Sequence, residues 1–276
     1  MRWRLIVDGA LRGALNMAVD EALVEAVDRG DSPPVLRLYR WEPACLSLGF
    51  AQPLAAADAA FCAANGVDLV RRPTGGRAVL HHLEQTYCVL ARLGEAPFST
   101  DLQAAYQGIC TALVAGLREL GAPAGLAGVP AGGYIKPTEA IPCFVGPASG
   151  EVVAGGRKLI GSAMRRHNRS ILQHGSLLEG WDSRLQAGCL GLPDDSSLRP
   201  VVTTLGELMG VTPDPARLVA ALVGGFETTF GIAVEASSLT AAERARAAFL
   251  AAERYGHERW TVHRNRSLPS TEPSVG

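Results

Sequence analysis

Cys143 and Lys158 are the two residues of this sequence whose types and spacing best suit chemistry. Cys143 follows a proline, and Lys158 comes a little further on, just after Gly155-Gly156. A thiolate is a strong nucleophile, and a nearby amine can lower the thiol pKa or stabilise a developing negative charge. A thiol and an amine held on or beside one sheet therefore suit acyl transfer. The same residue types also occur as a buried structural thiol and a solvated surface charge, so the pair alone leaves both interpretations open.

A hairpin is predicted to position Lys158. Two apolar runs flank Gly155-Gly156, and glycine supplies the positive φ angles of a tight hairpin turn. Lys158 then lies on the second strand, and residues 171–178 are expected to pair as a third. Residues 122–141, rich in Gly, Ala and Pro, form a long connection into Cys143. Such connections in compact domains are often lids or substrate-gripping segments.

A second glycine pair, Gly75-Gly76, lies between residues 67–72 and 78–81, two runs that predict strands. The pattern predicts another hairpin. Three arginines flank its turn: Arg71, Arg72 and Arg77. Glycine lets a ligand approach the backbone closely, and arginine can hold an anionic or carbonyl-bearing group. The alternative is a plain hairpin with solvated arginines. A P-loop is excluded because the Gly-Lys-Ser/Thr ending is missing.

The other apolar patterns predict a mixture of strands and helices without a sharp break in composition. Strands are expected over residues 3–7, 35–41, 45–50 and 85–93, and helices over residues 14–27, 55–64, 101–120, 204–209, 215–229 and 241–255. Capping boxes are expected at Thr100–Gln103 and Thr240–Glu243, and residues 182–200 are expected to be irregular. We predict one catalytic domain over residues 1–262 and a flexible tail over residues 263–276.

The composition predicts a globular protein. The 276 residues (29.0 kDa) are 47% hydrophobic and 19% charged, which suffices for a sizeable core. The net charge of −1 argues against a general nucleic-acid-binding surface, and the apolar runs are too short to predict a membrane span. The six cysteines are widely spaced, and no Cys or His cluster has metal-ligand spacing. Together with a start that lacks a secretion signal, this favours a cytoplasmic protein with reduced thiols and no metal.

Six stretches, in order, resemble landmarks of the lipoate/biotin protein ligase and octanoyltransferase superfamily. They are residues 16–23 (NMAVDEAL), 46–52 (LSLGFAQ), 71–81 (RRPTGGRAVLH), 156–163 (GRKLIGSA), 173–178 (QHGSLL) and 254–260 (RYGHERW). The resemblance therefore covers nearly the whole chain. Two features resemble the LipM-type octanoyltransferases in particular. Gly75-Gly76-Arg77 stands where lipoate ligases usually have a third glycine, and Cys143 stands where these transferases have a nucleophile.

The resemblance implies an α+β fold with mixed β-sheets flanked by helices, the class II synthetase-like catalytic domain of biotin and lipoate protein ligases. It implies transfer of an octanoyl group from octanoyl-acyl carrier protein, through a thioester on Cys143, to a lysine of a lipoyl-accepting protein such as the glycine-cleavage H protein. Lys158 is the second implied catalytic residue, and no cofactor is needed. The implied substrate-binding residues are Arg72, Gly75, Gly76, Arg77, His81, Gly161, Ser162, Ala163, His174 and Gly175. Gly75, Gly76 and the strand after them are expected to line an apolar tunnel for the acyl chain.

Two other functions stay open at this point: an ATP-dependent lipoate–protein ligase, and a non-catalytic module that binds a lipoyl domain or an acyl carrier. The intact Cys143 and Lys158 argue against the module. His81 and His174 could act as bases, although histidines more often orient a strand or satisfy a backbone group. A basic cluster could face an acidic carrier protein or form a solvated turn; it comprises Arg165, Arg166, His167 and Arg169. The five cysteines other than Cys143 are expected to serve packing.

Overall fold

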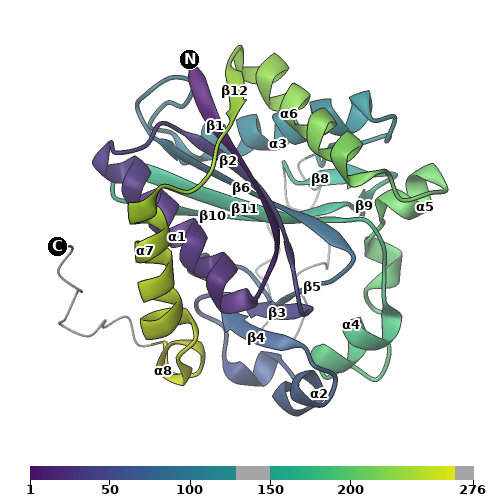
Figure 1. Cartoon of the computed structure of the whole chain (residues 1–276). Coiled ribbons are helices and arrows are strands. Elements are labelled where there is room, and N and C mark those ends of the chain that lie inside the picture. The colour runs from purple at the N-terminus through teal and green to yellow at the C-terminus, as the bar shows by residue number, and fades with distance from the viewer. Residues whose placement is uncertain (129–149, 265–276) are drawn as a thin grey trace.

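A six-stranded mixed sheet forms the centre of the computed structural model, which describes residues 1–128 and 150–264 (Figure 1). The strand order is β10-β11-β6-β2-β1-β12. These strands are β1 (Arg2–Leu11), β2 (Val35–Trp41), β6 (Glu84–Arg92), β10 (Ile160–His167), β11 (Ser170–Leu178) and β12 (Ala233–Ala236). β10, β11, β6 and β2 are antiparallel neighbours, whereas β2, β1 and β12 run parallel.

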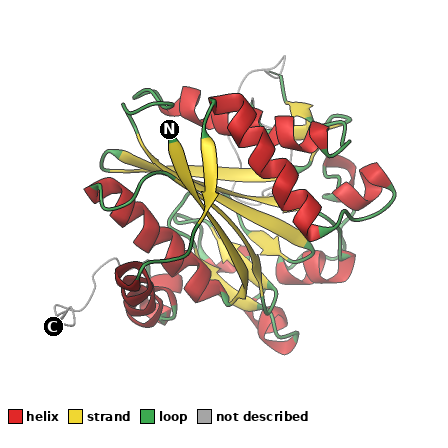
Figure 2. Ribbon diagram, turned by 45° about the horizontal axis from the view of Figure 1, so that its top comes forward, coloured by secondary structure: helices red, strands yellow, loops and turns green. Residues whose placement is uncertain are grey.

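Helices cover both faces of this sheet (Figures 1 and 2). One face carries α1 (Gly13–Arg29) and α7 (Ala241–Leu250), and the other carries α3 (Leu102–Glu119) and α6 (Pro215–Phe230). In β2, Val35 and Tyr39 belong to the α1 core, while Leu36 and Leu38 belong to the α3 and α6 core. Since successive side chains of a strand point to opposite faces, a strand covered on both sides is apolar along its length. The predicted α+β fold with helices flanking mixed sheets is confirmed.

Close contact between α3 and α6 fixes the inner face of α3. A Cβ on Gly225 would lie 2.3 Å from the Ala112 oxygen, and one on Gly116 would lie 2.4 Å from the Ala221 oxygen. Any larger side chain would force these helices apart. Cys110 is fully buried on this face, in the packing role expected of it.

A second sheet overturns the hairpin predicted at Gly75-Gly76. Its order is β4-β3-β5, with β3 (Cys45–Leu48), β4 (Asp68–Arg71) and β5 (Val79–His81). β4 and β5 do not pair with each other: β3 lies between them, parallel to β4 and antiparallel to β5. The chain therefore crosses the end of β3. Gly49 at that end lies so close to Gly76 that a Cβ there would be 1.9 Å from the Gly76 oxygen.

A third, small sheet contains the predicted Lys158 hairpin. It consists of β7 (Gly125–Leu126), β8 (Val152–Ala154) and β9 (Arg157–Lys158). β8 and β9 are antiparallel around Gly155 (φ 56°) and Gly156 (φ 74°), so the turn and the strand position of Lys158 are confirmed. The predicted third strand is confirmed as β11, which pairs with β10, the continuation of the second predicted run, although both strands belong to the central sheet. The chain changes sheet at Leu159, between β9 and β10.

Several helix boundaries differ from the sequence prediction because side-chain caps divide the segments. Asp58 caps α2 (Ala59–Ala64), which separates it from a 3-10 turn at Leu54–Ala56. Asp101, not Thr100, caps α3. Asp182 caps α4 (Ser183–Cys189) within the segment expected to be irregular.

Near the C-terminus, α5 (Leu205–Met209) and α6 follow the prediction closely. The predicted Thr240–Glu243 capping box begins α7 and is confirmed. The last predicted helix is divided into α7, a π-helical turn (Ala251–Tyr255) and α8 (Glu258–Thr261). Across residues 1–128 and 150–264, no helix combines the length and apolar character needed to cross a bilayer.

Candidate active site

A cavity lies where β10 and β11 meet the loop before β5. Eight of the ten predicted substrate-binding residues line it: Arg72, Gly76, His81, Gly161, Ser162, Ala163, His174 and Gly175. The other two, Gly75 and Arg77, adjoin Gly76 but do not line the cavity. The sequence motifs therefore meet at one place in the fold, although they come from separate sheets.

The sequence analysis missed several other lining residues: Met17, Tyr39, Trp41, Ser47, Val79, Thr86 and Ser176. The Trp41 ring stacks on His81 with centroids 4.0 Å apart, and its indole N–H donates to Thr86 Oγ1 at 2.7 Å. Met17, Ser47, Val79 and Ser176 lie inside motifs that the sequence already displayed. Trp41 lies outside these motifs. Which side of β2 its side chain occupies becomes clear only when the sheet is assembled.

Two buried arginines, Arg71 and Arg72, lead into the loop of residues 72–77. Arg72, only 4% exposed, donates to the backbone oxygens of Ser47 (2.9 Å), Gly75 (2.8 Å) and Arg77 (2.6 Å). Arg71 is fully buried and donates to four backbone oxygens, those of Gly49, Phe50, Gln52 and Thr261. The alternative of solvated arginines is wrong for these two. Within the described part of the chain, the N–H groups of Gly75 and Gly76 donate no hydrogen bond, which leaves them for a ligand acceptor.

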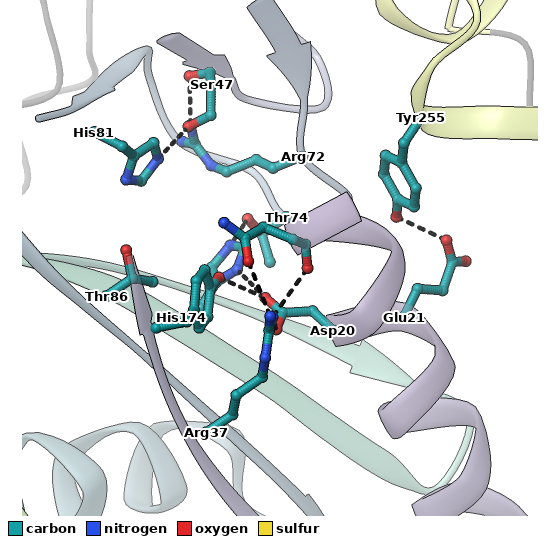
Figure 3. A network of polar contacts seen from close by, with 12 residues as sticks. Asp20, Glu21, Arg37, Ser47, Arg72, Thr74, His81, Thr86, His174 and Tyr255 are labelled. Atoms are coloured by element: carbon teal, nitrogen blue, oxygen red, sulfur yellow. Dashed lines mark hydrogen bonds and ion pairs between the residues drawn. The ribbon is translucent and has the colours of Figure 1, made fainter. Parts of the chain in front are cut away.

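A buried polar network joins α1, β2 and β11 to this loop (Figure 3). The Asp20 carboxylate accepts from Arg37 Nη1 at 2.7 Å and from the Tyr39 hydroxyl at 2.8 Å, and it lies 3.2 Å from His174 Nδ1. His174 Nε2 lies 2.7 Å from Thr74 Oγ1. Burial by itself would raise the pKa of Asp20, but Arg37 and His174 bring that pKa below its ordinary value. Asp20 is therefore an ionised group at neutral pH.

Asp20 and His174, together with Cys88, bring potential metal-ligand atoms within 4.8 Å of one another. The Asp20 oxygens already accept hydrogen bonds from Arg37 and Tyr39, and both His174 nitrogens have protein partners. The bonds favour a hydrogen-bonded network over a metal site.

His81 occupies the opposite wall of the cavity. Its Nε2 lies 2.9 Å from Ser47 Oγ, and its Nδ1 lies 3.6 Å from Glu84. Burial lowers the pKa of His81 despite the neighbouring Glu84, which acts in the other direction. The contacts of His81 and His174 support the structural interpretation of both histidines.

Lys158 is buried, so the alternative of a solvated surface charge is wrong for this residue. It is 3% exposed, and its Nζ donates to Glu151 Oε1 at 2.7 Å. β10 begins two residues after Lys158 and reaches the cavity at Gly161. Cys143 lies outside the described residues, as does most of the predicted 122–141 connection from residue 129 onward.

Polar groups that do not themselves line the cavity support its lining residue Ser162. The Tyr87 hydroxyl contacts Ser162 Oγ at 2.7 Å and accepts from Gln173 Nε2 at 2.9 Å. Burial raises the pKa of Cys110 to about 12, which keeps this thiol protonated and unreactive. A Cβ on Gly175 would lie 2.6 Å from the Tyr87 ring, so only glycine fits there.

A family model described as the lipoyl protein ligase A/B catalytic domain matches residues 12–227. The chain belongs to this family. The matched region contains Lys158, Cys143 and every residue that lines the cavity. The superfamily predicted from the six motifs is thereby confirmed.

Two relatives and two solved structures place the chain within the family. The Octanoyltransferase LipM of Symbiobacterium thermophilum is 37% identical over 276 residues, covering 95% of this chain and 98% of the relative. The Octanoyltransferase LipM of Kyrpidia tusciae is 38% identical over 273 residues, covering 95% and 99%. A lipoate-protein ligase A bound with ATP has a TM-score of 0.80 at 26% identity, covering 95% of this chain and 99% of that chain. The lipoate protein ligase of a Thermoplasma acidophilum lipoylation system has a TM-score of 0.78 at 25% identity, covering 97% and 98%.

Proposed function

We propose that the chain is a protein octanoyltransferase of the lipoylation pathway. It moves an octanoyl group from the thioester of acyl carrier protein, through Cys143, to a lysine of a lipoyl-accepting protein such as the glycine-cleavage H protein. The observation that carries this proposal is the cavity at β10 and β11, whose walls combine apolar side chains with an exposed Gly75-Gly76 turn at its rim. An apolar cavity with few polar groups is the usual form of a site for a small acyl ligand.

The cavity suits a hydrocarbon chain. Met17, Trp41 and Val79 supply apolar surface, and small residues on β10 leave space beside them. Burial of each methylene contributes about 0.8 kcal/mol, so an eight-carbon chain gains several kcal/mol without a charged contact. The N–H groups of Gly75 and Gly76 suit the carbonyl end of such a chain.

The proposed reaction has two balanced steps. The Cys143 thiolate attacks the carrier thioester, which forms a new thioester and releases the carrier thiol. The acceptor lysine amine then attacks this thioester, which forms an amide and returns the thiol to Cys143. A thioester is already activated, so neither step requires ATP. Amide formation drives the second step.

Lys158 is proposed as the cation that serves Cys143. An ammonium group lowers the pKa of a neighbouring thiol and stabilises an oxyanion that forms on the same carbonyl. The ion pair with Glu151 supports this role, because it holds the ammonium group in one position inside the protein.

Sequence similarity favours a transferase over a ligase. The relatives that match over nearly their full length at 37–38% identity are named octanoyltransferases, whereas the ATP-bound ligase shares 26%. The loop also reads Gly75-Gly76-Arg77, without the third glycine expected of a ligase. Exposed Arg166, near the end of β10, and exposed Arg169, in the turn before β11, suit an acidic carrier protein. We also propose a cytoplasmic location, in keeping with the widely spaced thiols.

A transfer assay separates the transferase from the ligase. Purified chain is incubated with an apo lipoyl-accepting protein and either octanoyl carrier protein or free octanoate with ATP and magnesium. We expect octanoylation of the acceptor from the thioester alone, and we expect Cys143→Ala to abolish it. Activity that requires ATP and survives Cys143→Ala would identify a ligase. An inactive wild-type chain that binds the acceptor would identify a binding module.

A further inference from the structure

Thr74 is the residue directly before Gly75-Gly76. It is fully buried and does not line the cavity. Its hydroxyl faces His174, and its backbone oxygen accepts from the Phe50 N–H at 2.8 Å. Thr74 is therefore held by contacts with other elements of the fold, and the glycine pair follows it directly in the chain.

The direction of each hydrogen bond follows from Asp20. An ionised carboxylate can only accept, so the proton between Asp20 and His174 belongs to His174 Nδ1. In the neutral imidazole, Nε2 is then an acceptor and the Thr74 hydroxyl donates to it. The charge of Asp20 is balanced by Arg37, which is fully buried and also donates to Asn16.

We propose that Asp20, His174 and Thr74 form a positioning chain that holds the Gly75-Gly76 turn at the cavity rim and thereby sets the rate of octanoyl transfer. The chain of contacts runs from helix α1 through the central sheet to the loop of the second sheet, so three elements that are separate in sequence fix one turn (Figure 3). The effect on rate depends on the proposed octanoyltransferase function. The effect on the turn itself does not.

Thr74 acts here as a positioning residue and not as a nucleophile. Thr74, His174 and Asp20 contact one another in the same order as the three residues of a hydrolase triad. The nucleophile of such a triad, however, must reach the substrate. The Thr74 side chain is fully buried outside the cavity lining, so an acyl group in the cavity does not touch it. Its contribution is to keep the two glycine N–H groups in a fixed direction.

The structure offers a matched set of variants. Thr74→Val removes the hydroxyl at nearly constant volume, Thr74→Ser retains it, and Thr74→Ala serves in place of Thr74→Val if that variant does not fold. Tyr255→Phe is the control. It removes the 2.7 Å hydrogen bond to Glu21, which also involves a buried α1 carboxylate but lies outside the loop (Figure 3).

Two measurements are made on the full chain: hydrogen exchange of a peptide that contains the Phe50 amide, which donates to the Thr74 backbone oxygen of the loop, and the single-turnover rate of octanoyl transfer from carrier protein to Cys143. We expect Thr74→Val to exchange about tenfold faster in this peptide and to acylate about tenfold more slowly, a change of about 1.4 kcal/mol in each. Thr74→Ser should restore both to within about twofold, and Tyr255→Phe should leave both unchanged while lowering the melting temperature.

Three results would overturn the positioning chain: unchanged exchange of the Phe50 peptide in Thr74→Val, unchanged acylation in that variant, or equally fast exchange of this peptide in Tyr255→Phe. If the wild-type chain acylates no cysteine, the proposed function fails instead. The exchange comparison then still decides whether Thr74 holds the turn.

Discussion

Replacing Glu151 with Gln tests the environment of Lys158 most sharply. The change preserves size but removes the carboxylate 2.7 Å from Lys158 Nζ. Both residues are buried, at 8% and 3% exposure. The buried ammonium group of Lys158 then loses the Glu151 carboxylate, and removing one member of a buried ion pair is costly.

The expected magnitude follows from this burial. Removing one partner of a buried ion pair lowers the free energy of unfolding by about 3–5 kcal/mol. Because the two residues keep some exposure, we expect Glu151→Gln to lie at the lower end of this range, at about 3 kcal/mol. For a chain of this size, that loss lowers the melting temperature by about 6–12 °C. Octanoyl transfer should fall as well, because the ammonium group loses the contact that fixes its position.

A double-mutant cycle in chemical denaturation isolates the pair. The free energy of unfolding is measured for the wild type, Glu151→Gln, Lys158→Met and the double variant. We expect the loss of stability in the double variant to be smaller than the sum of the two single losses by at least about 1.5 kcal/mol, because the double variant removes both charges of the ion pair together. Additivity within about 0.5 kcal/mol would refute the claim that these groups depend on each other.

Three further predictions concern the loop and the cavity. Gly49→Ala should displace the Gly76 backbone and reduce both the melting temperature and octanoyl transfer, whereas Gly9→Ala, which meets no atom within 4 Å, should change neither. The free energy of unfolding should fall as the pH drops below about 6.5, because the His81 side chain then binds a proton in the unfolded chain but not in the folded one, where burial lowers its pKa. His81→Gln should flatten this part of the pH profile. An unchanged slope would contradict the assignment to His81. Trp41→Ala should enlarge the cavity and shift the preferred acyl chain from eight carbons toward longer donors, as measured by competition between octanoyl and decanoyl carrier protein.

Local sequence pattern predicted the elements well because hydrophobic period and turn residues act over a few residues. The helix at Gly13–Arg29 and the hairpin at Gly155-Gly156 follow from such signals. The partner of a strand depends instead on the whole sheet. Gly75-Gly76 has the pattern of a hairpin turn, yet β3 from an earlier part of the chain occupies the space between the two flanking strands.

The site shows the same division between motif and assembly. Gly161, His174 and their motif neighbours were predicted and meet at the cavity. Trp41 was not, since nothing in an apolar strand indicates which alternate residues will face a ligand. The Lys158–Glu151 pair was also missed. Whether these two side chains are buried depends on how the small sheet packs, and the charge pattern of the sequence does not show that packing.

The central claim is that Cys143 carries the acyl group, and intact-mass spectrometry under single-turnover conditions tests it most directly. Wild-type chain mixed with octanoyl carrier protein, without acceptor, is expected to gain one octanoyl group that hydroxylamine removes. Cys143→Ser still contains the five buried thiols at positions 45, 62, 88, 110 and 189, so it controls for acylation elsewhere and should form no thioester adduct. A wild-type chain that modifies its acceptor without ever showing this adduct, or an equal thioester adduct on one of the five other cysteines of Cys143→Ser, would contradict the account.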